Sequence, residues 1–219
     1  MAIGNLVTRT GVEYAAKLRG DYVAVGAVTN GPFKYGETVT QATSLATGVV
    51  AFYEPTRLYL RNVVGTFNNS AVITGGTSGA TATASAVLTR AWFSAWVTVA
   101  RLRDTVSIGR TRDVTTITDF DTAEDTFADQ IVGNQQATMT ATMNIEPGGT
   151  TFQIFEAAVD SNWDVAIKRT LTDRAGTGVR LRYYTGVVSD FSETDSVNDA
   201  STVSFSLALN DSRTSDPTA

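Results

Sequence analysis

Strict alternation over residues 136–145 is the sequence feature that most constrains the fold of this chain. Small or apolar side chains alternate there with polar ones: Ala137, Met139, Ala141, Met143 and Ile145 against Thr138, Thr140, Thr142 and Asn144. Successive side chains of a β-strand point to opposite faces, so this period of two predicts a strand with one face in a core and one polar face. The turn residues 146–149 end the pattern.

Shorter patterns predict further strands and a single helix. Strands are expected over residues 57–63, 96–102, 105–118, 164–171, 178–189 and 201–210. In the last of these, Val203, Phe205, Leu207 and Leu209 are expected to face inward. The helix is expected from Thr151 to Asp160, with Thr150 or Thr151 as its N-cap and with Phe152, Phe155 and Val159 on its apolar stripe. The prediction is an all-β fold: an antiparallel β-sandwich or partly open barrel with one short flanking α-helix and an inserted small β-module.

An internal repeat marks the inserted module. Residues 32–47 are echoed by residues 66–81 at a constant offset of about 34 positions. Phe33, Thr40, Thr43, Ser44, Ala46 and Thr47 all meet identical residues at that offset. Threonine, valine and glycine in short alternations predict two similar hairpins. We therefore expect one domain from residues 1–31 and 90–213, an inserted module at 32–89 with an internal two-fold repeat, and a flexible tail at 214–219.

The composition excludes most kinds of catalytic site. The chain has no cysteine and no histidine, which removes disulfides, zinc–thiolate sites, histidine general bases and the Ser-His-Asp triad. No carboxylate pair stands out as a glycosidase centre, so we expect no enzyme, no cofactor and no metal.

The net charge of −5 does not favour binding of nucleic acid by the whole surface, although solubility explains that charge equally well. No signal peptide and no apolar run of membrane-spanning length is evident, so assembly in a cytoplasm and no membrane partner are expected.

Two charged groups are candidate assembly residues. Residues 119–130 carry five acids and no base, namely Asp119, Asp121, Glu124, Asp125 and Asp129, and are predicted to form a long loop. Such a loop could order against a neighbouring subunit or stay solvated. A calcium site is disfavoured because the central glycine and closing glutamate of the usual calcium loop are missing. Arg180 and Arg182 share one strand face and are expected to pair with this loop across an interface, or with a neighbouring strand of the same chain.

Three linked pieces of the chain carry a family resemblance. They are the acidic segment running to Gly133, the alternating strand that leads into the helix, and the two segments 183–189 and 202–207. In this order, residues 103–213 resemble the major tail tube proteins of bacteriophages with long, non-contractile tails. The resemblance implies a virion protein, assembled in the host cytoplasm, that forms hexameric rings stacked into a tail tube.

The resemblance also implies roles for partners and for the acidic segment. DNA would pass through the lumen during ejection without sequence-specific binding. Terminator, tape measure and distal tail proteins would be further partners. The acidic residues would belong to a loop that stacks one ring on the next.

Other functions are compatible with the same sequence. A capsid decoration protein, a head–tail joining protein or the tube of a related secretion machine would also be a structural β-protein. A β-sandwich that binds glycans is the alternative outside assembly, with Trp92, Trp96 and Tyr59 as sugar-stacking residues. Trp92, Phe93 and Trp96 are either exposed anchors or core residues. A tube subunit predicts a concentration-dependent polymer, whereas a glycan-binding module predicts a small species retained on a glycan column.

Overall fold

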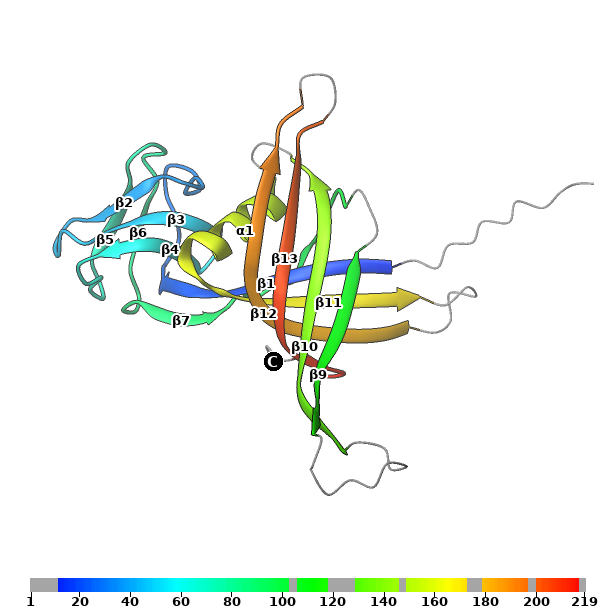
Figure 1. Ribbon diagram of the computed structural model, residues 1–219. Helices are drawn as coiled ribbons and strands as arrows, with labels where there is room; N and C mark the ends of the chain where they lie inside the picture. Colours follow the sequence, from blue (N-terminus) through cyan, green and yellow to red (C-terminus); the bar gives the residue numbers. More distant parts are fainter. Residues whose placement is uncertain are drawn as a thin grey trace, which may run out of the picture.

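The computed structural model of the protein describes residues 12–102, 106–117, 129–145, 149–172, 179–196 and 200–216. Its strands form one continuous antiparallel sheet of 13 strands that is not closed into a barrel. Among the described residues there is one helix, α1 (Thr150–Ser161), which lies beside the sheet (Figure 1). The expected antiparallel all-β fold with one short helix is therefore confirmed.

Six long strands make the larger part of the sheet. They are β1 (Val12–Ala24), β9 (Ser107–Ile117), β10 (Asp129–Asn144), β11 (Asp164–Thr172), β12 (Val179–Thr194) and β13 (Thr202–Arg213). Their order across the sheet is β1-β11-β12-β13-β10-β9. The predicted alternating strand lies in β10, where Met139, Ala141 and Met143 are buried and Thr138 and Thr140 are exposed. The prediction of one core face and one polar face is confirmed for these residues.

Helix α1 packs its inner face against this part of the sheet. Its buried residues are Ile154, Phe155, Ala157 and Ala158, and the ring of Phe155 stacks on Phe205 of β13 with centroids 4.2 Å apart. The predicted apolar stripe is wrong at Val159, which is 41% exposed. The predicted N-cap is also wrong: Gly149 holds that position without a side-chain cap. The Thr151 hydroxyl instead accepts from the backbone N–H of Ala100 and donates to the carbonyl of Thr98.

Seven shorter strands lie between β1 and β9 in the sequence. They are β2 (Thr38–Gln41), β3 (Thr47–Glu54), β4 (Arg57–Val64), β5 (Val72–Gly75), β6 (Thr81–Thr83), β7 (Thr89–Trp92) and β8 (Val97–Thr98). Strands β2 to β6 surround a second hydrophobic core and lie to one side of the long strands (Figure 1). Strand β4 separates the two cores, because Leu58 and Leu60 point into the second core and Tyr59 into the first. The predicted strand over residues 57–63, with both leucines on one face, is confirmed.

The two copies of the repeat are related by an approximate two-fold axis. Strands β2 and β5 pair antiparallel with Thr40 opposite Thr74, its own equivalent. Two reciprocal hydrogen bonds flank this pair: Gly76 N–H donates to the Thr38 carbonyl (2.9 Å), and Ala42 N–H donates to the Val72 carbonyl (3.1 Å). Positive φ angles recur at the same offset, at Gly31 and Gly65, Gly36 and Ser70, and Leu45 and Gly79. The domain boundaries proposed from the sequence stay a prediction.

The two edges of the sheet, β6 and β9, differ in how they are covered. At one end, β6 is flanked by residues 25–29 through the isolated bridges Val25–Ala84 and Thr29–Thr81. At the other end, β9 pairs with β10 and with no other strand in the part of the chain that the structure describes. Within that same part, no helix has the length and apolar character needed to cross a membrane.

Candidate assembly site

Strand β9 presents a long open edge of hydrogen-bonding groups. Its residues Ser107–Ile117 pair with β10 on one side, with a register shift between Val132 and Gln135. Residues 109–112 are solvent-exposed. An edge strand leaves alternate backbone N–H and C=O groups unpaired, so it can accept a strand of another chain. The geometry of β9 therefore suits association by strand pairing.

The predicted acidic segment lies beside this edge in the sequence, between β9 and β10. Asp119, Asp121, Glu124 and Asp125 fall outside the described residues. Asp129 is described, and it belongs to β10, where its backbone pairs with Ile117. The loop predicted to reach residue 130 therefore ends earlier, because strand pairing continues to Asp129.

The two arginines singled out from the sequence lie near the start of β12. Arg180 is exposed and lies opposite Leu171 of β11, while Arg182 is half-buried and lies opposite Arg169. Neither forms an ion pair among the described residues. Across the strands, Arg182 faces the like charge of Arg169. Pairing with a neighbouring subunit stays a prediction.

The aromatic residues singled out from the sequence are mostly core residues. Phe93 is buried and stacks on Phe52 with centroids 4.5 Å apart. Tyr59 is fully buried, and burial raises the pKa of its hydroxyl to about 12. Trp96 is half-buried beneath two ammonium groups, with Lys17 Nζ 5.1 Å and Lys168 Nζ 5.3 Å from its ring centroid. These residues do not form a shared exposed aromatic surface.

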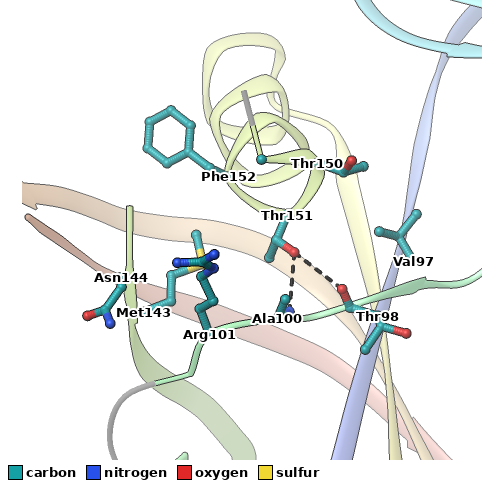
Figure 2. A pocket seen from close by; sticks show the side chains of 10 residues that line it. Val97, Thr98, Ala100, Arg101, Met143, Asn144, Thr150, Thr151 and Phe152 are labelled. Carbon is teal, nitrogen blue, oxygen red and sulfur yellow. Dashed lines mark hydrogen bonds between the residues drawn. The ribbon is translucent and has the colours of Figure 1, made fainter. Parts of the chain in front are cut away.

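A pocket of about 340 Å³ opens where the N-terminus of α1 meets β10 and the segment after β8 (Figure 2). Thr151 ties the helix to Thr98 and Ala100 on one side, while Arg101 and Met143 lie together on the other (Figure 2). Among its described lining residues, Arg101 is the one titratable side chain. A single titratable side chain does not make a general acid–base pair.

Sequence patterns did not reveal the open edge of β9. The residues of β9 were predicted to form a strand, but its place at the edge follows from β10 pairing with β13, whose paired residues are 58 to 72 positions away in the sequence. A local pattern of residues predicts a strand but does not predict which distant strands pair with it. Residues 109–112 are exposed on both faces of the strand, but exposure of this kind does not by itself mark an edge strand.

The comparisons with known proteins give distant similarity to solved structures. No protein-family model matches the chain, and no curated protein matches it. The fold is similar to a chain in the cryo-EM structure of the anti-feeding prophage baseplate, with a TM-score of 0.44 and 11% sequence identity. The similarity covers 55% of this chain and 84% of that chain. It is too distant to assign the protein to a family.

Proposed function

We propose that this protein is a structural subunit of a bacteriophage tail that associates with itself into rings, which stack into a tail tube. The proposal draws on the sequence resemblance of residues 103–213 and on the open edge of the sheet. In this function the chain performs no catalysis and holds no cofactor. Its rings would be hexameric, and DNA would pass through them during ejection.

The open edge of β9 is the observation that carries the proposal. In the described part of the chain no other element covers the outer edge of this 11-residue strand, and such an edge can pair with a strand of another chain. Natural proteins either protect such an edge or pair it with a strand of another chain. A neighbouring copy that pairs with β9 would satisfy its backbone groups and extend the sheet from one subunit to the next. Identical head-to-tail contacts of this kind close into rings when the rotation between subunits allows it.

The glycan-binding alternative finds less support. Sugar rings stack on exposed aromatic faces, but Tyr59 is fully buried and contacts Phe93 with centroids 4.4 Å apart. Trp96 is engaged by Lys17, Lys168 and Tyr183. A glycan site built on these residues would require the first core to open.

Negative-stain electron microscopy of the purified protein across a concentration series tests the proposal, with light scattering beside it. Rings or hollow tubes of uniform width, with six-fold end views, are the expected result. A species that stays monomeric at every concentration, also in the presence of the other tail proteins, would contradict it. Retention of that monomer on a glycan column would instead favour the binding module.

Proline substitution tests the role of the β9 edge. Thr111 and Arg112 are adjacent, so one of their N–H groups points toward β10 and the other away from it. Proline has no N–H. The variant in which proline replaces the outward residue should keep its thermal midpoint and lose assembly, and the other variant should be destabilised. Arg112→Gln controls for the lost charge. Normal tubes from a proline variant at the outward position would exclude β9 as the pairing edge.

A further inference from the structure

Four basic side chains converge on one pocket of this acidic protein. The pocket has a volume of about 440 Å³ and lies where β1, β4 and β7 meet. Its charged lining residues are Lys17, Arg19, Arg57 and Arg90, and its remaining described lining consists of Ala91, Trp92, Phe93 and Ser94. No carboxylate belongs to this lining, although the whole chain has a net charge of −5.

Strand register brings the four cations together from three strands. Lys17 and Arg19 stand two positions apart on β1 and therefore share a face. Arg19 lies opposite Trp92 of β7, and two residues further along, Arg90 lies opposite Asp21. Arg57 begins β4 and lies opposite Ala24 of β1. Positions this far apart in the sequence are adjacent because β1 pairs with both β4 and β7.

Arg57 and Arg90 are oriented by contacts with uncharged groups. Arg57 donates from Nη1 to the Trp92 carbonyl (3.0 Å), and its guanidinium lies 4.9 Å from the ring centroid of Tyr22. Arg90 donates from Nη2 to the carbonyl of Asn162 (3.4 Å). A carbonyl and an aromatic ring fix the direction of a guanidinium without neutralising it.

Nearby carboxylates offset only part of this positive charge. Asp164 meets Arg19 at 3.7 Å, but both side chains are well exposed, so the pair contributes little. Asp21 makes no ion pair with Arg90 among the described residues. Glu54 is buried near Arg57 and is not part of the lining, and its carboxylate accepts the backbone N–H of Ser94, a lining residue.

We propose that this pocket binds a phosphate group. Cations held close together in a partly enclosed space repel one another, and an anion bound between them relieves that repulsion. The guanidinium of an arginine can donate two parallel hydrogen bonds to phosphate oxygens, and Lys17, which is 7% exposed, belongs to the same lining. A phosphate carries more charge than a carboxylate and can accept hydrogen bonds from β1, β4 and β7 at once. The source of the group is either a free phosphate compound or the backbone of DNA.

Titration with pyrophosphate, followed by calorimetry and by broadening of its ³¹P resonance, tests this site at constant ionic strength. The wild-type protein should bind one equivalent saturably. The double variant Arg19→Gln/Arg90→Gln should bind at least about tenfold more weakly, because each guanidinium contributes a charge-assisted hydrogen bond. Both side chains are exposed, so the double variant should remain folded, which circular dichroism and the thermal midpoint will check.

A matched control separates the pocket from general charge. Arg180→Gln removes the same charge at an exposed position of β12 and should leave pyrophosphate binding unchanged. Equal binding by wild type and double variant, or an equal loss in Arg180→Gln, would overturn the proposal. Competition by a short DNA oligonucleotide would identify DNA as the source of the phosphate, and its absence would identify a free phosphate compound.

Discussion

At the scale of single residues, Glu37 holds the two repeats of the small module together. It is 5% exposed, and its carboxylate accepts the backbone N–H groups of Thr77 and Ser78 (3.1 and 2.8 Å) and the Ser78 hydroxyl (2.8 Å). It also accepts the N–H of Lys34 in its own repeat (2.6 Å). One side chain thus closes a turn of each hairpin.

Removal of this carboxylate should destabilise the protein. Glu37→Ala leaves three partly buried N–H donors without their acceptor, so the free energy of unfolding should fall by about 3 kcal/mol. Urea denaturation measures this change. The exposed Glu13 provides the control, because Glu13→Gln should change stability by less than about 0.5 kcal/mol. An equal decrease in the free energy of unfolding in both variants would mean that the hydrogen bonds of Glu37 do not stabilise the fold.

The same residue should make stability depend on pH. Burial acts to raise the pKa of Glu37, but hydrogen bonds from Ser78, Lys34 and Thr77 outweigh it and hold the pKa below its ordinary value of 4.5. A lowered folded-state pKa means that the stabilisation is complete above the unfolded-state pKa and is lost as pH falls through the folded-state pKa. The stability difference between wild type and Glu37→Gln should therefore shrink below about pH 4.5. Denaturation at a series of pH values would reveal a constant difference if this linkage were absent.

At the scale of elements, the register of β12 with β13 shifts between Thr185 and Gly186. A Cβ at Gly186 would lie 2.1 Å from the backbone oxygen of Ala208. At Gly109 of β9, by contrast, the nearest atom to a Cβ is the Thr138 hydroxyl oxygen at 3.8 Å. The two glycines are in strands of the same sheet, so they differ mainly in the space around them.

Alanine substitution at these glycines should have opposite consequences. Gly186→Ala forces backbone movement between β12 and β13 and should cost about 2 kcal/mol or more, whereas Gly109→Ala should be tolerated within about 0.5 kcal/mol. Thermal and urea unfolding of both variants measure this. Equal stability of the two would show that the close approach of β12 and β13 relaxes without cost.

Helix α1 joins the small module to the long strands. The hydroxyl of Tyr35 donates to Glu156, and Arg61 forms an ion pair with Asp160. Burial, together with the hydrogen bond to Glu156, raises the pKa of Tyr35 above its ordinary value, so this hydroxyl remains a donor at neutral pH. A double-mutant cycle of Tyr35→Phe and Glu156→Gln should give a coupling of about 1 kcal/mol. Additive effects would mean that the two side chains do not act together.

The same elements show what the sequence could predict. The helix was predicted to within one residue at each end, and β10, β4 and β13 from their alternation, because these patterns are local. The cap and Val159 were predicted wrongly because tertiary contacts decided them: Thr151 bonds to Thr98 and Ala100, and Ile154 rather than Val159 faces the sheet. The basic pocket could not be predicted either, since its four cations come from three strands.

At the scale of the whole molecule, the acidic segment is the predicted contact between stacked rings. Neutralising Asp119, Asp121, Glu124 and Asp125 to Asn or Gln should leave the protein folded and shorten its tubes, because the electrostatic contact with the next ring is removed. Electron microscopy measures tube length, and circular dichroism checks the fold. Tubes of unchanged length would remove the segment from the stacking contact.

The approximate two-fold axis between β2 and β5 has a consequence for the history of the chain. Thr40 meets its equivalent Thr74 across this axis, and the hydrogen bonds on either side are reciprocal. An ancestral polypeptide with a single repeat would have exposed the β2 edge that β5 now covers. Two such polypeptides would have paired about a true symmetry axis. Duplication and fusion of their gene would then have turned a homodimer into one continuous segment, freeing its halves to diverge, as Leu45 has from Gly79.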